Sequence, residues 1–271
     1  IPILTETPSD LFGVVIVTRD GKVFKAGDVD YEFSIQSVSK PFTAALVMSE
    51  QGPEALKEKI GVEPTGMAFN SKLALAVYED SVNPLVNAGA IAAVSLVQAT
   101  SEQDRWNKVQ QNLSDFAGRP LTVLEKVYES EYTTAFGNRG IANLLYNWGR
   151  LYSEPEEALR VYTRECSVGV SAKDLGVMGA TLANLGVNPL TKKQVMPAEH
   201  VPELLALMAT AGFYDESGVW MYKAGLPAKT GVGGGIVAVV PGRFAIAAFS
   251  PRLNEAGNSV RSMKAIQDIA A

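Results

Sequence analysis

Ser37 and Lys40 stand three residues apart in the stretch FSIQSVSKPFTAAL, which covers residues 33–46. Residues i and i+3 share one face of a helix, so the hydroxyl and the amine can meet. Serine is a weak nucleophile until a neighbouring base takes its proton. Lysine becomes such a base when burial or a nearby cation lowers its pKa. The spacing therefore favours a serine nucleophile with a lysine base, although the tetrapeptide alone also fits a solvated first turn with a capping serine.

A second cluster, KTGVGGG, begins at Lys229 at the end of a predicted strand. If this strand lies beside the Ser37 helix, the N–H groups of Val232 and Ser37 can together hold an oxyanion. Lys229 would then be a second cation that helps to keep Lys40 neutral. A phosphate loop fits poorly, because that motif has glycine before the lysine and a helix after it, whereas here Ala228 precedes and a strand follows. An ordinary glycine-rich turn stays open.

The composition narrows the chemistry further. His200 is the single histidine of the 271 residues, which argues against a metal site built from several histidines and cysteines. We expect His200 to be a solvated residue at a helix start. Cys166 is the single cysteine, and we expect it to be a packed, inert side chain rather than the nucleophile. It can form no internal disulfide, which fits a reducing compartment.

The charge balance and the hydropathy argue against nucleic-acid binding and against a membrane-spanning segment. The net charge is −5 and the sequence has no basic cluster, so nucleic acid is not expected as a partner. No apolar run approaches the roughly 18 residues that suggest a membrane span.

Strand signals lie at the two chain ends and helical periodicity lies between them. Residues 12–27 form two β-rich runs around Asp20-Gly21, which predicts a hairpin. Late strands are expected in residues 225–231, 234–242 and 243–251. Helices are expected in residues 87–99, 137–151, 171–186 and 258–270, with Asn87 as the N-cap of the first of these.

These elements predict an α+β fold in which both chain ends build one five-stranded antiparallel sheet, flanked by helices and carrying an inserted helical lobe. We expect one domain over residues 1–271, with a sheet lobe at approximately 1–36 and 205–271 and a helical lobe at approximately 41–200. An early S-x-x-K, a late K-T-G and such a sheet together resemble the serine β-lactamases and penicillin-binding proteins. Their intermediate S-x-N motif has a weak match at residues 81–83.

A closer resemblance covers nearly the whole chain. FSIQSVSKPF, GVEPTGMAFNS, NPLVNAGAI, YESEYTTAFGNRGIANLL, YTRECSV, AGFYDESG, GLPAKTGVGGGI and SPRLNEAGNS are similar, in this order, to motifs of the serine-dependent glutaminases. That family hydrolyses L-glutamine to L-glutamate and ammonia, and it has the β-lactamase-like fold. In the family a tyrosine that reaches the substrate immediately precedes the position of Ile1, where the present sequence starts.

The resemblance implies roles for eight residues. Ser37 is implied as the nucleophile and Lys40 as its partner, with Tyr162 or Tyr214 relaying the proton. The implied substrate contacts are Ser37, Asn87, Glu131, Asn138, Tyr162, Tyr214 and Val232. Their types suit glutamine, because a carboxylate can hold its α-ammonium group, and amides and a hydroxyl can hold its α-carboxylate. Each also has an ordinary explanation as a helix cap, a core aromatic residue or a solvated acid.

The resemblance implies no metal or organic cofactor, a homodimer or homotetramer, and a cytoplasmic location. Two other functions stay open from the sequence. A penicillin-recognising serine hydrolase would have the same fold. A non-catalytic protein that binds glutamine or glutamate would keep Glu131 and the asparagines without a reactive Ser37.

Overall fold

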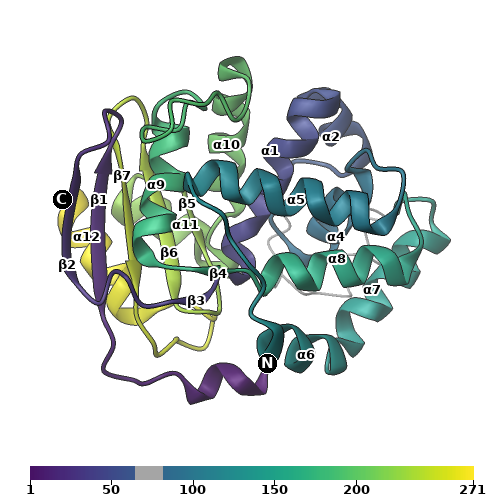
Figure 1. Ribbon diagram of the computed structural model, residues 1–271, viewed down its shortest axis with the longest axis horizontal. Coiled ribbons are helices and arrows are strands. Elements are labelled where there is room, and N and C mark those ends of the chain that lie inside the picture. Colours follow the sequence, from purple (N-terminus) through teal and green to yellow (C-terminus); the bar gives the residue numbers. More distant parts are fainter. Residues whose placement is uncertain (65–81) are drawn as a thin grey trace.

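The computed structural model describes residues 1–64 and 82–271 and places a five-stranded sheet beside a group of helices (Figure 1). The sheet has the strand order β2-β1-β7-β6-β5, and every neighbouring pair is antiparallel. The prediction of one antiparallel sheet built from both chain ends is therefore confirmed. Its strands are β1 (Gly13–Thr18), β2 (Val23–Gly27), β5 (Ala228–Thr230), β6 (Gly235–Val240) and β7 (Phe244–Phe249).

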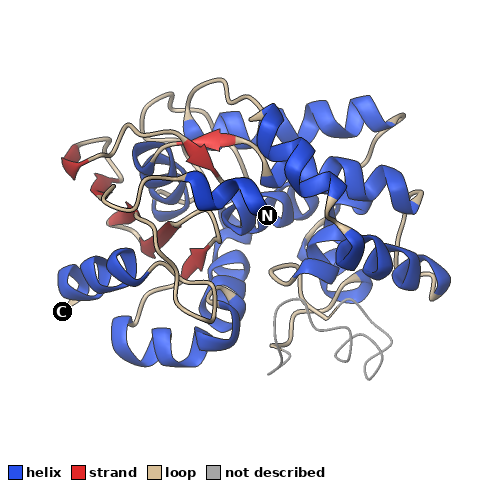
Figure 2. Ribbon diagram, turned by 90° about the horizontal axis from the view of Figure 1, so that it is seen from below, coloured by secondary structure: helices blue, strands red, loops and turns tan. Residues whose placement is uncertain are grey.

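The sheet separates two apolar clusters, because successive side chains of a strand point to opposite faces. On β1, Val15 and Val17 belong to the larger cluster, while Val14 and Ile16 pack against the smaller one. Helices cover both faces, and Figure 2 shows the strands lying between them. The larger cluster is covered by α9 (Ala172–Ala183), and the smaller by α11 (Ser217–Ala224) and α12 (Val260–Ala270).

Helix α9 lies directly on the sheet. It begins at a capping box in which Ser171 and Asp174 exchange side-chain and backbone hydrogen bonds. A Cβ atom added at Gly179 would lie 2.6 Å from Val237 on β6, so glycine permits this close approach. The expected helical lobe, approximately 41–200, includes this segment. In the structure α9 packs against the sheet, because its apolar side chains are buried there.

The remaining helices form the group beside the sheet, in which α4 has all ten residues buried and packs against α1, α7 and α8. Its sequence NAGAIAAVSL is rich in small side chains, which lets neighbouring helices approach it closely. The helices on this side are α1 (Lys40–Gln51), α2 (Pro53–Lys59), α4 (Asn87–Leu96), α5 (Glu102–Ala117), α6 (Glu125–Thr133), α7 (Phe136–Asn147), α8 (Pro155–Cys166) and α10 (Val201–Ala211). Four 3-10 turns complete the described elements: η1 (Pro2–Glu6), η2 (Gln36–Ser39), η3 (Ala198–His200) and η4 (Tyr214–Glu216).

A second, two-stranded sheet was not predicted. It pairs β3 (Phe33–Ser34) with β4 (Gly169–Val170), and the N–H of Ile35 donates to the carbonyl of Val168 at 2.8 Å. Two-residue strands carry no periodicity that a sequence pattern could reveal. This sheet fixes the chain just before Ser37 against the segment that follows α8.

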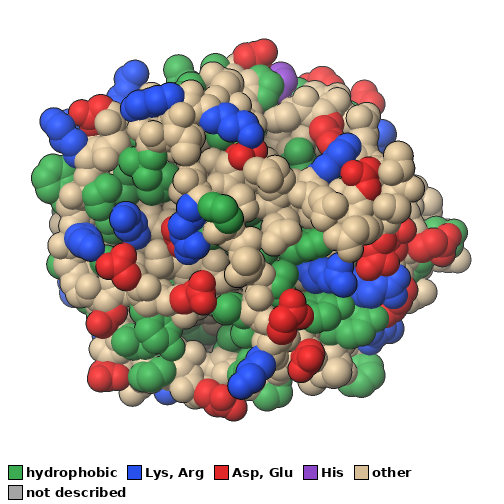
Figure 3. Space-filling view, in the orientation of Figure 1, with side chains coloured by type: hydrophobic (Ala, Val, Ile, Leu, Met, Phe, Trp, Pro, Cys, Tyr) green, Lys and Arg blue, Asp and Glu red, His purple; other side chains and the backbone are tan. Residues whose placement is uncertain are grey.

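Lysine, arginine and acidic side chains are interspersed over the face seen in Figure 3. This mixture agrees with a net charge of −5 without a basic cluster. In the part of the chain that the structure describes, none of the helices has both the length and the apolar character needed to cross a membrane.

Candidate active site

Ser37 and Lys40 meet at the start of α1. Ser37 lies in the 3-10 turn η2, which continues directly into α1, so Lys40 is the first α-helical residue. Lys40 Nζ donates to Ser37 Oγ at 2.9 Å, and the two side chains are in residues that are only 1% and 6% exposed. The pair is therefore buried, and the alternative of a solvent-exposed first helical turn is wrong. Burial lowers the pKa of Lys40 to about 8, so roughly one tenth of it is a free amine at pH 7 and about half at pH 8.

The residue before the serine adopts an unusual backbone conformation. Gln36 has a φ of +50°, in the left-handed region that favours glycine. A side-chain-bearing residue is held there only when its surroundings fix it, and such residues gather at functional sites. Gln36 Nε2 donates to Glu131 Oε2 at 3.1 Å and to Ser34 Oγ at 3.2 Å. These hydrogen bonds fix the turn that presents Ser37.

Asn87 connects Lys40 to two further predicted residues. Its Oδ1 accepts from Lys40 Nζ at 2.7 Å and from the Tyr162 hydroxyl at 3.3 Å. Its Nδ2 donates to Asn138 Oδ1 at 3.1 Å. Asn87 is the first residue of α4 and its side chain does not cap that helix, so the expected N-cap role is wrong. Asn138 Nδ2 donates to no acceptor among the described residues, so it can donate to a ligand in the cavity.

A cavity of about 480 Å³ opens over this network, a size typical of small-molecule sites. Six of the eight predicted site residues line it, and Lys40 and Tyr214 lie beneath its surface. The lining residues are Ile1, Gln36, Ser37, Asn87, Glu131, Thr134, Ala135, Gly137, Asn138, Ile141, Tyr162 and Val232.

Glu131 is a buried acid in the last turn of α6. Burial raises its pKa to about 7, while the hydrogen bond from Gln36 acts in the opposite direction. A solvated acid at a helix start is therefore excluded for this residue. Glu131 takes part in none of the ion pairs of the described residues, and a buried carboxylate of this kind in a cavity is well suited to binding a cationic group of a ligand.

The turn between β5 and β6 approaches the backbone of η2. A Cβ atom added at Gly231 would lie 3.3 Å from the Ser37 nitrogen and 3.0 Å from the Ile35 oxygen. Glycine therefore lets the turn come into contact with the nucleophile's own backbone. The next residue, Val232, lines the cavity beside Ser37. The position suits the expected pair of N–H groups around an oxyanion.

Tyr214 is the other hydroxyl near the serine. It lies in η4 with a φ of +53°, and its carbonyl accepts from Ser217 Oγ at 2.8 Å, which secures the turn. Burial raises the pKa of Tyr214 well above its ordinary value, while interactions with Ser37 and the Val232 backbone lower it. Burial also raises the pKa of Tyr162. Both phenols therefore stay protonated near neutral pH.

Lys229 lies beside Tyr214, where burial disfavours the charge that was expected for it. It is fully buried, Nζ donates to the Thr230 carbonyl at 2.7 Å, and Nζ lies 4.5 Å from the centroid of the Tyr214 ring. Burial lowers the pKa of Lys229 well below its ordinary value, and the charge of Lys40 lowers it further. Burial, rather than a second cation, depresses the pKa of Lys40.

Cys166 and His200 agree with their expected minor roles. Cys166 is buried at the end of α8, and burial raises the pKa of its thiol well above the ordinary value, so no thiolate is available. His200 ends the turn η3 before α10 and does not line the cavity.

Some positions need correction or addition. Ser81 of the weak S-x-N match lies outside the described residues, and the Asn83 amide binds the backbone at Val62 and Leu85. Sequence reasoning missed Gln36 and Glu165 as members of the buried polar network. A polar residue directly before the nucleophile in an otherwise apolar run was the available signal for Gln36.

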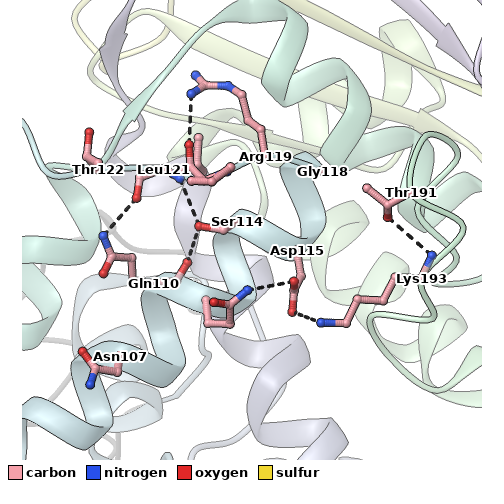
Figure 4. Close-up of a pocket in the computed structure, with 12 residues that line it drawn as sticks. Asn107, Gln110, Ser114, Asp115, Gly118, Arg119, Leu121, Thr122, Thr191 and Lys193 are labelled. Atoms are coloured by element: carbon pink, nitrogen blue, oxygen red, sulfur yellow. Dashed lines mark hydrogen bonds and ion pairs between the residues drawn. The ribbon is translucent and has the colours of Figure 1, made fainter.

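Another cavity, of about 560 Å³, lies at the end of α5 (Figure 4). Its charged side chains already have partners: Lys193 pairs with Asp115 at 2.6 Å, and Arg119 pairs with Asp174 at 2.6 Å. These ion pairs leave it without the buried, reactive groups that the Ser37 cavity has.

Comparisons with known proteins agree with these observations. The family model described as Glutaminase matches residues 1–271. The chain is 54% identical over 271 residues to a glutaminase of Mycobacterium ulcerans (strain Agy99), which covers 100% of this chain and 85% of that protein. The solved structure of the probable glutaminase ybaS is 49% identical with a TM-score of 0.98, over 100% of this chain and 88% of the other. The structure of Mglu in its glutamate form is 38% identical with a TM-score of 0.94, over 100% and 62%.

Proposed function

Because this chain belongs to the glutaminase family, and is therefore an amidohydrolase, we propose that it hydrolyses L-glutamine to L-glutamate and ammonia through an acyl-enzyme on Ser37. The observation that carries the mechanism is the 2.9 Å hydrogen bond between Lys40 Nζ and Ser37 Oγ beneath a cavity. The chemistry of the neighbouring side chains then matches the parts of glutamine.

Recognition of the substrate uses the polar cavity wall. The Glu131 carboxylate binds the α-ammonium group, because it is a buried acid with no cation of its own among the described ion pairs. The Asn138 amide nitrogen donates to the α-carboxylate, since Asn87 occupies its oxygen. The Tyr162 hydroxyl lines the same wall. These contacts direct the side-chain amide toward Ser37.

Acylation begins when Lys40 is a free amine. Its lone pair accepts the Ser37 hydroxyl proton while Oγ bonds to the amide carbon of the substrate. The carbonyl oxygen becomes an oxyanion, which the N–H groups of Ser37 and Val232 stabilise. The carbon–nitrogen bond then breaks, and the proton held by Lys40 passes to the leaving nitrogen, giving ammonia and an ester on Ser37.

Tyr214 is the better candidate for relaying that proton. Its pKa responds to Ser37 and to the Val232 backbone, whereas the Tyr162 hydroxyl donates to Asn87. Deacylation reverses the sequence with water: Lys40 takes a proton from water, the resulting hydroxide attacks the ester, and Ser37 Oγ leaves with the proton as glutamate forms. The relative Mglu, solved in its glutamate form, supports glutamate as the ligand of such a site.

Labelling with 6-diazo-5-oxo-L-norleucine, followed by peptide mass spectrometry, tests the proposal. We expect an adduct on Ser37 and loss of ammonia release in a folded Ser37→Ala variant, while His200→Ala keeps its activity. An adduct on Cys166 would overturn the assigned nucleophile. Absence of any adduct or turnover would favour a protein that only binds glutamine or glutamate. Turnover of a chromogenic β-lactam instead of glutamine would favour the penicillin-recognising alternative.

The family resemblance also leads us to propose a homodimer or homotetramer located in the cytoplasm. Large apolar side chains such as Phe136, 75% exposed, and Tyr222, 92% exposed, are the kind of surface that a second copy can cover. The molar mass in solution tests the assembly, and a monomer would exclude it.

A further inference from the structure

Glu165 is a buried acid that the proposed mechanism leaves unused. It lies in the last turn of α8, is 1% exposed, and does not line the cavity. Neither carboxyl oxygen has a hydrogen bond of normal geometry within the described structure. A buried acid with so few hydrogen bonds destabilises the fold, and such groups in native proteins often have a function.

The position of Glu165 points to Lys40. Helix α8 packs against η2, and the hydroxyl groups of Ser39 and Thr43 face the Glu165 carboxyl and lower its pKa. Ser39 and Thr43 flank Lys40 at the junction of η2 and α1. The carboxyl therefore lies close to Lys40 without lining the cavity. The charges of Glu165 and Lys40 act on each other, each favouring the ionised form of its partner.

Other titratable groups face this cluster from the surrounding elements, but most are neutral. Burial raises the pKa of Cys166, Tyr162 and Tyr214, so these three side chains stay protonated and uncharged near neutral pH, and burial also disfavours the charged form of Lys229. The remaining buried acid is Glu131 on α6. In the proposed complex the substrate ammonium group neutralises it. Glu165 is then the anion left to act on Lys40.

We propose that Glu165 is a positioning residue that acts through Lys40: its negative charge holds the proton on Lys40, and so sets both the pH at which Lys40 becomes a free amine and the strength of that amine as a base. The inference rests on the proposed role of Lys40 as the base. During acylation Lys40 becomes an ammonium ion, which an adjacent anion stabilises. The acid of a Ser-His-Asp triad supports its histidine in a comparable way.

Removal of the charge should separate two kinetic effects. In Glu165→Gln, Lys40 should lose its proton more easily, so the rise of kcat/KM with pH, expected near the Lys40 pKa of about 8, should move down by about one pH unit. Because the amine is then a weaker base, the plateau of kcat should fall by about threefold. KM should stay unchanged, since Glu165 lies outside the cavity wall.

The experiment measures ammonia release from pH 6 to pH 10 for the native protein and four variants. Glu165→Gln and the apolar Glu165→Met should both shift the profile downward, and Glu165→Asp, which keeps the charge, should restore the native midpoint. Glu157→Gln is the matched control on the same helix, where the acid pairs with Arg105 instead, and should leave the profile unchanged. Two uncharged substitutions of Glu165 are used so that the test survives if one variant does not fold. Thermal unfolding shows whether each variant is folded.

Profiles of folded Glu165→Gln and Glu165→Met that coincide with the native profile would overturn the inference. A shift that Glu165→Asp does not restore would also count against it, because charge would not be the cause. Failure of the proposed function is distinguishable. If the native protein is not labelled on Ser37, the acyl-enzyme is wrong, whereas labelling on Ser37 with coinciding profiles removes only the role of Glu165.

Discussion

Gln36 has a strained backbone and also contacts the acid that is proposed to bind the ligand. Its φ of +50° aims the following residue, Ser37, into the cavity, and its side chain holds Glu131 at 3.1 Å. The nucleophile and the acid proposed to bind the substrate ammonium group are thereby positioned by one residue. A left-handed residue with a side chain is stable only when several contacts fix it, and the hydrogen bonds to Glu131 and Ser34 supply these contacts.

Glu131→Gln should weaken glutamine binding while leaving the fold intact. The change keeps the shape and removes the charge proposed to hold the α-ammonium group. Loss of one partner of a buried charged pair typically costs about 2–5 kcal/mol, or roughly 30- to 4,000-fold in affinity. The loss appears in KM if the contact is equal in ground and transition states, and in kcat as well if it positions the amide.

The sharper measurement compares kcat/KM for glutamine and for glutaramic acid, which lacks the α-amino group. Native protein should prefer glutamine strongly, and Glu131→Gln should prefer it much less. Glu129→Gln, an exposed acid on the same helix, is the matched control. If Glu131→Gln retained the native preference for glutamine over glutaramic acid, Glu131 would not be the residue that binds the ammonium group.

For single residues, the sequence predicted correctly which side chains lie together, but it did not predict their pKa values. S-x-x-K spacing placed Ser37 beside Lys40, and the ordered motifs brought Asn87 and Asn138 to the same cavity. The lowered pKa of Lys229 was not predictable, because it depends on complete burial of both lysines, which only the folded chain reveals. The burial of Glu165 was hidden for the same reason.

At the scale of the elements, α4 is secured at its end by a residue of the next helix. Arg105 on α5 donates through Nη1 to the carbonyl groups of Val94, at 3.2 Å, and Ser95, at 2.9 Å, and also to that of Val97. Its Nε donates to Glu157 on α8 at 2.9 Å. The guanidinium group thus satisfies helix-end carbonyls and links α4, which begins with Asn87, to α5 and α8.

Arg105→Lys should destabilise the protein, because an ammonium group cannot reproduce this planar set of hydrogen bonds. We expect a loss of about 1–3 kcal/mol in the free energy of unfolding, measured by urea denaturation. Arg160→Lys is the matched control, since Arg160 pairs with Glu102 in a half-buried position and should lose less than about 1 kcal/mol. Equal losses in the two variants would contradict the structural role given to Arg105.

Long or strongly patterned elements were predictable and short ones were not. The hairpin of β1 and β2, the strands β6 and β7 and the helix α12 follow the sequence patterns. The pairing of β3 with β4 was missed, and Ser37 lies in a 3-10 turn rather than in the α-helix expected there. Tertiary contacts rather than local periodicity determine such two- to four-residue elements.

For the whole molecule, the buried cluster should make stability depend on pH. The pKa values of Glu131 and Glu165 are raised to about 7 by burial, so the folded state binds protons more tightly than the unfolded chain. This contribution is fully present below about pH 4.5 and is lost as the pH rises through about 7. Lys40, with its pKa lowered to about 8, contributes in the opposite sense, so stability is regained as the pH rises from about 8 towards 10.5. The cluster should therefore stabilise the fold least between about pH 7 and pH 8.

Glu165→Gln isolates one part of this effect. Relative to the native protein, the variant should gain up to about 3 kcal/mol in the free energy of unfolding between pH 5 and pH 7.5, because it removes an acid whose pKa is shifted from 4.5 to about 7. Urea denaturation at several pH values measures the difference. A difference that stayed constant across this range would show that the acid does not titrate there.

The division into a sheet lobe and a helical lobe stays a prediction at this scale. The sheet was predictable because both chain ends carry strong strand and turn signals. The place of α9 was not, since an apolar helix with two glycines fits a helix bundle and a sheet face equally well in sequence. The folded chain places β1 side chains opposite Gly176, and Val237 and Ala245 opposite Gly179.

The pairing of β1 with β7, for example Gly13 with Phe249, has a consequence for how the protein is made. A ribosome adds about 5–20 residues per second, so β1 waits roughly ten to fifty seconds for its partner strand. Until then Val15 and Val17 have no β7 beside them, and Ser37 has no Val232 beside it. The growing chain therefore exposes the apolar face of β1 until β7 has been made, and the proposed oxyanion hole cannot form before Val232 has been added.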